Sequence, residues 1–189
     1  MNRKEEITAL AKQLFKEKGY MGSSMRDLAQ RVGIEAASLY NHFKSKEELL
    51  QKICFDLANE YMENLETLKK RKYGSVSAWL ESAMHLHLKT TADNIEASSV
   101  FLNEWRFLTG EALEDYKKFR KNYEDQFRNA VLKGTENREF RNNLDPKITT
   151  ISILSALNWT ANWFKADGKE DIRTVANQLF DLTINGLKQ

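Results

Sequence analysis

Apolar residues recur along this chain at the three- and four-residue spacing of an α-helix, with polar residues at the positions between them. The first segment with this spacing carries Ile7, Leu10, Ala11, Leu14 and Phe15. We therefore predict an amphipathic helix over residues 3–18. Gly19 is expected to end this helix, because glycine readily adopts the conformation that follows a helix C-terminus.

Two shorter helices, separated by a glycine, are predicted next. Ser24 is a favourable N-cap for the first, and Asp27 stands three residues later, where a capping box places its acid. Gly33 interrupts the pattern, and the second helix is predicted from about Ala36 to Phe43. The apolar side chains that can hold this pair together are Leu28, Ala29, Val32, Leu39 and Phe43.

A fourth helix is predicted from about residue 46 to residue 70. Ser45 and Glu48 have the spacing of a capping box at its start. Its apolar face carries Leu49, Ile53, Leu57, Tyr61 and Leu65. Beyond it, we expect a helix from about Val76, one or two short helices over residues 93–108, and a long helix that ends at Gly134.

The last part of the chain contains two further helices. Asp145 and Pro146 are a favourable N-cap and first residue for a helix over residues 146–165, which is apolar on several faces. The final helix is amphipathic and carries Ile172, Val175, Ala176, Leu179, Phe180, Thr183 and Leu187. The sequence has no alternating strand pattern, so it predicts an all-α fold of about nine helices.

Composition agrees with this pattern and adds little chemistry. The 189 residues include one proline and eight glycines, few enough breakers for long helices. The single cysteine, Cys54, excludes an internal disulfide. The sequence contains neither a signal peptide nor an apolar run of membrane-spanning length, so we expect a cytoplasmic protein without membrane contact. Residues 1–50 hold nine Lys/Arg against seven Asp/Glu, whereas the rest of the chain holds 20 of each.

The order helix, glycine, short helix in the first quarter is typical of a helix-turn-helix, in which the second helix enters the DNA major groove. We accordingly divide the chain into a DNA-binding domain over residues 1–47 and a larger helical domain over residues 48–189. On the recognition helix, hydroxyl and amide groups suit base edges and phosphates. The candidate DNA contacts are Ala36, Ala37, Ser38, Tyr40, Asn41 and His42 on that helix, with Ser24, Arg26 and Lys46 at helix starts.

The segment "LFKEKGYMGSSMRDLAQRVGIEAASLYNHFKSKEELL" closely resembles the DNA-binding domain of TetR-family repressors. The matching residues are Phe15, Gly19, Tyr20, Ser24, Leu28, Ala29, Gly33, Leu39, Tyr40, Phe43, Lys46 and Leu49. Glu35 departs from the family pattern, which often has a serine or threonine that caps the recognition helix. The resemblance implies a repressor that binds double-stranded operator DNA. The alternative is a helical enzyme or scaffold whose three-helix segment has no specific affinity for DNA.

A single recognition helix makes few contacts, and a dimer supplies two of them about 34–36 Å apart on a palindromic operator. The resemblance implies that the last two helices pair across a two-fold axis into a four-helix bundle. The alternative is that these helices form only an intramolecular core. The candidate residues of a homodimer interface are Ile153, Leu157, Val175, Leu179, Phe180 and Thr183.

TetR-like regulators usually take a small-molecule effector in the larger domain. The segments "EDYKKFRKNYEDQFR" and "NWTANWF" resemble a subgroup that senses acyl-CoA thioesters. In such a site an apolar slot takes the acyl chain, cations such as Arg120 meet phosphates and Trp163 stacks on a flat group. Alternatives are an effector that is a hydrophobic drug or metabolite without CoA, or aromatic residues that serve only as core. The candidate ligand contacts are Phe101, Trp105, Arg120, Tyr123, Phe127, Trp159, Asn162 and Trp163.

Other chemistry is not indicated. His85 and His87 are two residues apart and point to opposite sides of a helix, so they cannot share a metal ion. The sequence has no glycine-rich phosphate loop and no nucleophile motif. We therefore expect no catalytic residues, no metal and no cofactor, and interpret the chain as a regulator and not as an enzyme.

Overall fold

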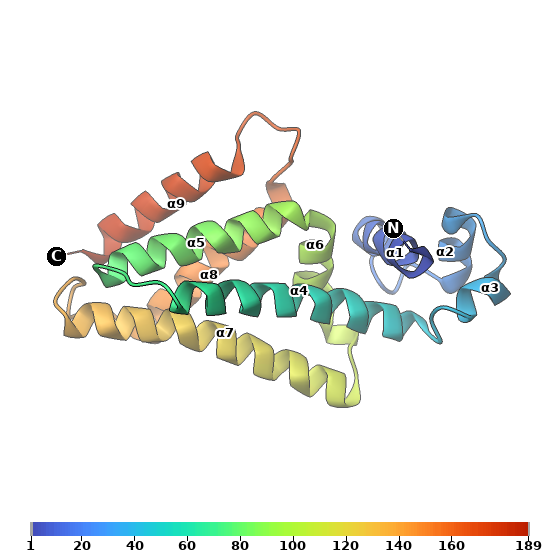
Figure 1. The fold of residues 1–189 in the computed structure, drawn as a ribbon, viewed down its shortest axis with the longest axis horizontal. Helices are drawn as coiled ribbons and strands as arrows, with labels where there is room; N and C mark the ends of the chain where they lie inside the picture. The colour runs from blue at the N-terminus through green and yellow to red at the C-terminus, as the bar shows by residue number, and fades with distance from the viewer. Residues whose placement is uncertain (1, 189) are drawn as a thin grey trace. The chain divides into compact units, whose positions relative to one another are not determined.

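The chain folds into nine α-helices and one turn of 3₁₀-helix, η1, in the computed structural model, which describes residues 2–188 (Figure 1). The prediction of an all-α fold is therefore confirmed. The elements are α1 Arg3–Lys18, α2 Met25–Val32, α3 Ala36–Tyr40, α4 Lys46–Lys69, α5 Val76–Asp93, α6 Ile95–Asn103, η1 Trp105–Phe107, α7 Gly110–Glu136, α8 Pro146–Trp163 and α9 Ile172–Leu187.

These helices form two compact units. Unit 1 contains the chain up to Asn59 together with Asn94–Lys117, and unit 2 contains Glu60–Asp93 and Lys118–Gln189. The helices α4 and α7 each run from one unit into the other along the chain. Unit 1 therefore holds α1 to α3, the start of α4, and also α6, η1 and the first turns of α7.

The first helices begin and end at the predicted residues. The side chain of Ser24 accepts a hydrogen bond from the Asp27 amide at 3.1 Å, and the Asp27 carboxylate accepts one from the Ser24 amide at 2.9 Å. These two bonds complete the predicted capping box of α2. Gly19 and Gly33 follow α1 and α2 with φ of 72° and 74°, values that glycine adopts without a steric penalty.

The recognition helix α3 is shorter than predicted, ending at Tyr40 instead of Phe43. Its N-cap, Glu35, makes no side-chain capping bond, as its departure from the family pattern suggested. Beyond Tyr40 the chain continues as a turn, in which the amides of His42 and Phe43 both donate to the Leu39 carbonyl. The residues predicted to hold α2 and α3 are all buried, namely Leu28, Ala29, Val32, Leu39 and Phe43.

At the start of α4, one of the two hydrogen bonds of the predicted capping box is present. The Glu48 amide donates to Ser45 Oγ at 3.0 Å, as expected. The Glu48 carboxylate accepts a hydrogen bond from the Lys44 amide, at 2.6 Å, instead of one from the Ser45 amide. The turn before α4 is therefore fixed at two successive residues.

Unit 2 is built around α5, which packs against both α8 and α9 (Figure 1). The N-terminus of α5 is capped by Glu139, whose carboxylate accepts hydrogen bonds from the amides of Val76 and Ser77, both at 3.0 Å. Burial acts to raise the pKa of Glu139, but these hydrogen bonds outweigh it and hold the pKa below its usual value. The predicted cap of α8 is also present, since Asp145 Oδ1 accepts from the Ile148 amide at 2.8 Å.

The prediction that α7 ends at Gly134 is wrong, because the helix continues to Glu136. A Cβ atom placed on Gly134 would lie only 2.2 Å from Cδ2 of Phe140, whose side chain is fully buried. Glycine is therefore required at this position for close packing and not for helix termination.

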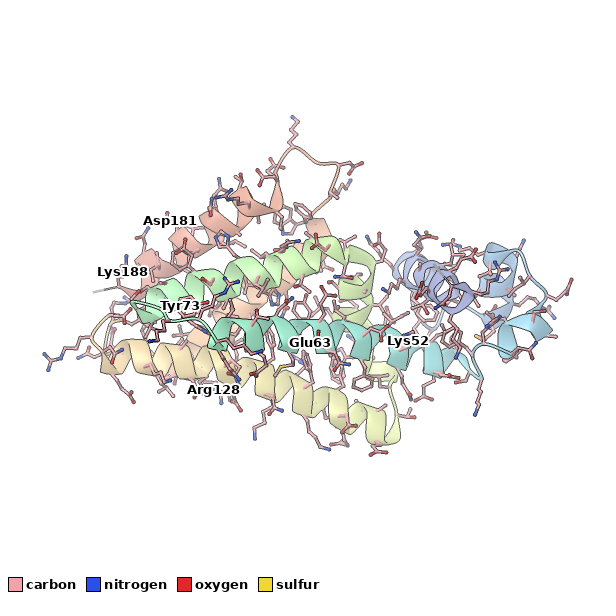
Figure 2. All side chains as sticks on the ribbon, viewed as in Figure 1. Lys52, Glu63, Tyr73, Arg128, Asp181 and Lys188 are labelled. Atoms are coloured by element: carbon pink, nitrogen blue, oxygen red, sulfur yellow. The ribbon has the colours of Figure 1, made fainter. Side chains whose placement is uncertain are left out.

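The charged residues lie mainly on helix surfaces, where they pair along single helices (Figure 2). Lys52 contacts Asp56 at 2.9 Å on α4, and Arg128 contacts Asp125 at 3.2 Å on α7. Exposed pairs of this kind contribute only a few tenths of a kcal/mol. The fold therefore depends on the apolar faces of the helices and on their caps.

Candidate nucleic-acid interface and ligand site

The outer face of α3 is polar and exposed, and the apolar side chains on its inner side are buried. Leu39 is fully buried and Phe43 is 2 % exposed, whereas Tyr40 between them in sequence is 51 % exposed. Three further candidate DNA contacts, Ala37, Ser38 and Asn41, are also exposed. Ala36 and His42 are partly exposed. The structure thus places the six predicted residues of this segment at or near the surface.

The other three predicted DNA contacts differ in their exposure and in the hydrogen bonds of their side chains. Arg26 is exposed in the first turn of α2. Ser24 is exposed too, but its side chain is used in capping α2. Lys46 is only partly exposed, and its Nζ donates to the carbonyls of Tyr20 at 2.7 Å and Ser23 at 2.8 Å.

The role of Lys46 as a DNA contact stays a prediction, and the contacts that the structure shows for it lie within the protein. Two of its three ammonium hydrogens are engaged, and the ammonium also lies 4.2 Å from the centre of the Tyr20 ring. Burial lowers the pKa of Lys46. These interactions connect the start of α4 to the turn between α1 and α2. They leave the ammonium little hydrogen-bonding capacity for a DNA phosphate.

The turn between α1 and α2 also contacts Asn94–Lys117, the second segment of unit 1. The Tyr20 amide donates to the Glu104 carboxylate at 3.1 Å, and the Tyr20 ring stacks on Phe107 with centroids 5.3 Å apart. Nearby, Glu47 accepts from the amide and hydroxyl of Thr109 at 3.1 and 2.7 Å. Sequence reasoning missed these contacts, because Glu104, Phe107 and Thr109 are distant in sequence and carry no local pattern.

The predicted ligand contacts are not gathered in one cavity within either unit. Phe101 and Trp105 belong to unit 1, where both rings pack against Tyr116. Tyr123 and Phe127 are buried in unit 2. Arg120 is exposed on α7, and Asn162 is exposed on α8.

Tyr123 belongs to a buried polar and aromatic cluster in unit 2. Its hydroxyl lies 3.0 Å from His87 Nδ1, and the His87 ring stacks on Tyr61 with centroids 4.9 Å apart. Burial lowers the pKa of His87 to about 3, although the side chain of Asn158 acts in the opposite direction. The Asn158 side chain does not reach hydrogen-bonding geometry, since His87 Nε2 has no partner within residues 2–188.

Half of the six predicted dimer residues are internal to the single chain. Ile153, Leu157 and Val175 are buried within the single chain, so they serve its core. Leu179, Phe180 and Thr183 are partly exposed. The large apolar side chains exposed on α8 and α9 are instead Ile148, Ile151, Trp159, Trp163 and Leu182.

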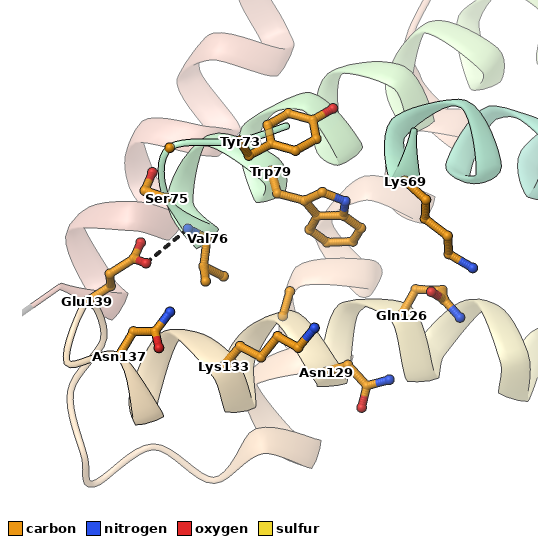
Figure 3. A pocket seen from close by; sticks show the side chains of 12 residues that line it. Lys69, Tyr73, Ser75, Val76, Trp79, Gln126, Asn129, Lys133, Asn137 and Glu139 are labelled. Carbon is orange, nitrogen blue, oxygen red and sulfur yellow. Dashed lines mark hydrogen bonds between the residues drawn. The ribbon is translucent and has the colours of Figure 1, made fainter. Parts of the chain in front are cut away.

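One cavity of unit 2, of about 490 Å³, lies beside Trp79 (Figure 3). Lys69 and Lys133 reach it from α4 and α7, and the amides of Gln126 and Asn129 line its α7 side. Trp79 packs edge-on against Phe127, with centroids 5.9 Å apart. The cavity therefore has an aromatic wall, two amines and, with Asn137, three amides, none of which was predicted as a ligand contact.

A second cavity of unit 2, of about 670 Å³, lies between α4, α5 and α9 and is lined partly by His85. His85 and His87 do lie on opposite sides of α5, since His87 is buried against Tyr123. Among the residues that the structure describes, no group of three His, Cys, Asp or Glu side chains could hold a metal ion.

Two family models cover most of the chain. Residues 7–53 match the model of bacterial regulatory proteins of the tetR family. Residues 73–187 match the model of the tetracyclin repressor-like C-terminal domain, which spans more than half of the sequence. The chain belongs to the TetR family of transcriptional regulators.

Relatives of this TetR-family chain agree over its full length. It is 26 % identical over 196 residues to the HTH-type transcriptional repressor KstR2 of Mycolicibacterium smegmatis, covering 100 % of this chain and 92 % of the relative. The TetR-family regulator PfmR of Thermus thermophilus is 30 % identical, with a TM-score of 0.86 and complete coverage of both chains. AibR, solved in complex with isovaleryl coenzyme A and operator DNA, is 24 % identical with a TM-score of 0.84, covering 96 % of this chain and 97 % of AibR.

These comparisons identify this TetR-family protein as a DNA-binding helix-turn-helix transcriptional repressor and not an enzyme. In a helix-turn-helix the second helix enters the major groove, so the exposed face of α3 is the candidate DNA-contacting surface. No helix within residues 2–188 is long and apolar enough to cross a membrane.

Proposed function

We propose that this protein is a homodimeric repressor that leaves a palindromic operator when a CoA thioester binds to it. The observation that carries the proposal is the geometry of α3, in which the exposed Tyr40 and Asn41 lie between the buried Leu39 and Phe43. A short helix held from behind by its apolar side chains can present all its polar groups to the major groove. Two copies related by a two-fold axis then read two half-sites.

The DNA contacts fall into two groups under this proposal. Tyr40, Asn41 and Ser38 are placed to reach base edges or phosphates from α3. Arg26 is exposed at the start of α2, where a guanidinium and the helix N-terminus both favour a phosphate. Lys46 contributes indirectly, by holding the turn that contains Tyr20 and Ser23.

The effector part of the proposal is supported by the relatives. AibR has been solved with isovaleryl coenzyme A and operator DNA together, so a fold of this kind can bind a CoA thioester. The relative from Bacillus subtilis is a fatty acid metabolism regulator, 22 % identical over 183 residues. Unit 2 provides an aromatic interior around Tyr123 and Phe127 and two surface cavities, and we place the effector there.

DNA binding is tested with the DNA upstream of the protein's own gene, by fluorescence anisotropy over a range of salt concentrations. We expect binding at least 1,000-fold tighter than to random duplex, on the order of specificity usual for repressors, with affinity falling steeply as salt rises. Tyr40→Ala should weaken this binding at least tenfold, whereas the equally conservative change Met21→Ala, at a 70 % exposed apolar residue outside α3, should not. Equal binding to random duplex would support the alternative of a helical protein without specific DNA binding.

The effector is tested by adding CoA thioesters of different chain length to the protein–operator complex, with the matching free acids as controls. Release by thioesters alone supports the proposal. The second candidate function is a sensor of hydrophobic molecules without CoA, which the aromatic interior around Tyr123 and Phe127 favours. Release by free acids or hydrophobic drugs, and not by thioesters, would support that candidate instead.

A further inference from the structure

The cavity between α4, α5 and α9 has a composition that the proposed function does not explain. Its volume of about 670 Å³ falls in the usual range for small-molecule sites. Apolar side chains such as Leu68 and Leu86 form part of its wall. Its charged and polar lining includes Asn64, Arg71, Glu81, His85, Lys89 and Arg173.

The charged groups of this cavity are mainly positive. Arg71 follows α4, Lys89 lies on α5, and Arg173 lies in the first turn of α9, so the cations come from three parts of the fold. Glu81 contributes one negative charge, and Lys89 is already paired with Asp93. Arg71 and Arg173 have no carboxylate partner among the described residues. Two arginines without a carboxylate partner among the described residues therefore line one cavity, and both are exposed to solvent.

His85 adds an independent observation. Its Nε2 atom is buried and has no hydrogen-bond partner within residues 2–188. Other polar groups around the cavity are satisfied, because Asn64 Nδ2 donates to Thr90 Oγ1 at 2.8 Å and Ser82 Oγ donates to the Ala78 carbonyl at 3.0 Å. The unused hydrogen-bonding capacity thus belongs to the two arginines and to one imidazole, which are all able to donate.

We propose that this cavity binds a phosphate-bearing ligand. Guanidinium groups bind phosphate oxygens through paired hydrogen bonds, and a ring N–H of His85 supplies one more donor. The apolar wall suits the uncharged body of a nucleotide. The phosphates can belong to the nucleotide end of a CoA thioester, in which case the inference rests on the proposed function, or to a free nucleotide or inorganic phosphate.

The proposal is tested by calorimetric titration of the full-length protein with coenzyme A, adenosine 3′,5′-bisphosphate and inorganic phosphate. We expect the double variant Arg71→Ala/Arg173→Ala to bind the preferred probe at least tenfold more weakly than the wild type. Lys147→Ala is the control, because Lys147 is an exposed cation that lines neither cavity, and binding of the probe to this variant should be unchanged. Binding of coenzyme A and the bisphosphate identifies a nucleotide site, whereas binding of inorganic phosphate alone identifies a free-phosphate site.

A second variant, His85→Leu, separates a binding role from a structural one. Because the Nε2 atom is unpartnered, its removal should leave the melting temperature of the free protein unchanged or higher while it weakens binding of the probe. The proposal is overturned if none of the three probes binds at millimolar concentration, or if the double variant binds like the wild type.

Failure of this inference can be told apart from failure of the proposed function. Equal release of operator DNA from the wild type and the double variant by the same thioester concentration would exclude the cavity as the site of the thioester's phosphates and leave the proposed effector in place. Loss of coenzyme A binding in the double variant, with no release of operator by any thioester, would establish the cavity and exclude the thioester as effector.

Discussion

The Lys46 side chain connects the start of α4 to the turn between α1 and α2. Its ammonium donates hydrogen bonds to the backbone carbonyls of Tyr20 and Ser23, in the turn between α1 and α2. It also lies over the Tyr20 ring. The same Tyr20 is held by Glu104 through its amide. The turn is therefore fixed from two sides by residues that are far away in sequence.

Lys46→Ala should lower the stability of the protein by roughly 1–3 kcal/mol, because two hydrogen bonds from a charged donor are lost. Operator affinity should fall as well, since the α1–α2 turn and the start of α4 lose their connection. The slope of affinity against salt concentration should not change, because no phosphate contact is removed. Thermal unfolding and anisotropy at several salt concentrations measure these effects.

Arg26→Ala is the comparison for this prediction, since Arg26 is exposed at the start of α2. We expect it to leave stability unchanged and to reduce the salt slope by about 1 for each copy that contacts DNA. A reduced salt slope in Lys46→Ala, together with unchanged stability, would show that Lys46 does bind a phosphate.

Gly134→Ala is expected to destabilise the protein by roughly 1–3 kcal/mol, the usual cost of overpacking a core. The added methyl would lie 2.2 Å from Cδ2 of the buried Phe140. Gly186→Ala is the matched control, because Gly186 is also helical but has no atom within 4 Å of its added Cβ. That change should be neutral or stabilising by up to about 1 kcal/mol. Equal effects of both changes, measured by chemical denaturation, would contradict the packing argument.

At the scale of the elements, local patterns predicted the helices and their caps well. The bounds of α1 and α2 and the caps at Ser24 and Asp145 depend on residues within a few positions of one another. The early end of α3 and the continuation of α7 through Gly134 were not predictable in this way. Both depend on tertiary packing, of Leu39 and Phe43 in one case and of Phe140 in the other.

The candidate sites were predictable to different degrees for the same reason. The outer face of α3 follows from the local alternation of buried and exposed residues, and the structure places it as expected. Helix α8 is apolar on several faces, so the sequence alone did not separate the buried Ile153 from the exposed Ile151. The cavity with Arg71 and Arg173 joins residues that are about 100 positions apart, and no sequence pattern indicates such a pair.

Helix α5 should make the protein sensitive to acid through His87. The pKa of His87 is about 3 in the folded state, against an ordinary value of 6.5, because burial disfavours the charged ring. Below pH 6.5 the unfolded chain takes up a proton that the folded chain does not. The contribution of His87 to the free energy of unfolding should therefore be fully present above pH 6.5. It should fall by up to about 1.4 kcal/mol per pH unit as the pH decreases toward 3.

The measurement is chemical denaturation of the wild type and of His87→Phe at several pH values between 7 and 4. Phenylalanine preserves a ring beside Tyr61 but cannot be protonated. The variant should be less stable at pH 7, because the Tyr123 hydroxyl loses its partner, and its stability should fall less steeply with decreasing pH. Parallel pH dependence of the two proteins would show that other groups cause the acid sensitivity.

At the scale of the whole molecule, the apolar residues that remain exposed are concentrated on the last helices. Five of the eight large apolar residues exposed among residues 2–188 belong to α8 and α9, and Leu182 is the most exposed of them at 72 %. A single copy therefore leaves these five apolar side chains in contact with water. Because a palindromic operator requires two recognition helices, we expect a second copy to cover this surface.

Leu182→Arg should disrupt the proposed dimer, since a charge within an apolar interface must be desolvated without a partner. We expect dimer affinity to fall by about 2 kcal/mol or more, roughly 30-fold, as at other well-buried interface positions. The intramolecular fold should be retained, because Leu182 is exposed in the single chain. Sedimentation velocity at micromolar concentration measures the change, and operator affinity should fall with it. Leu132→Arg, at an exposed apolar residue of α7, is the control and should leave the dimer intact. If Leu182→Arg remains dimeric while Leu132→Arg becomes monomeric, then α7 and not α9 forms the interface.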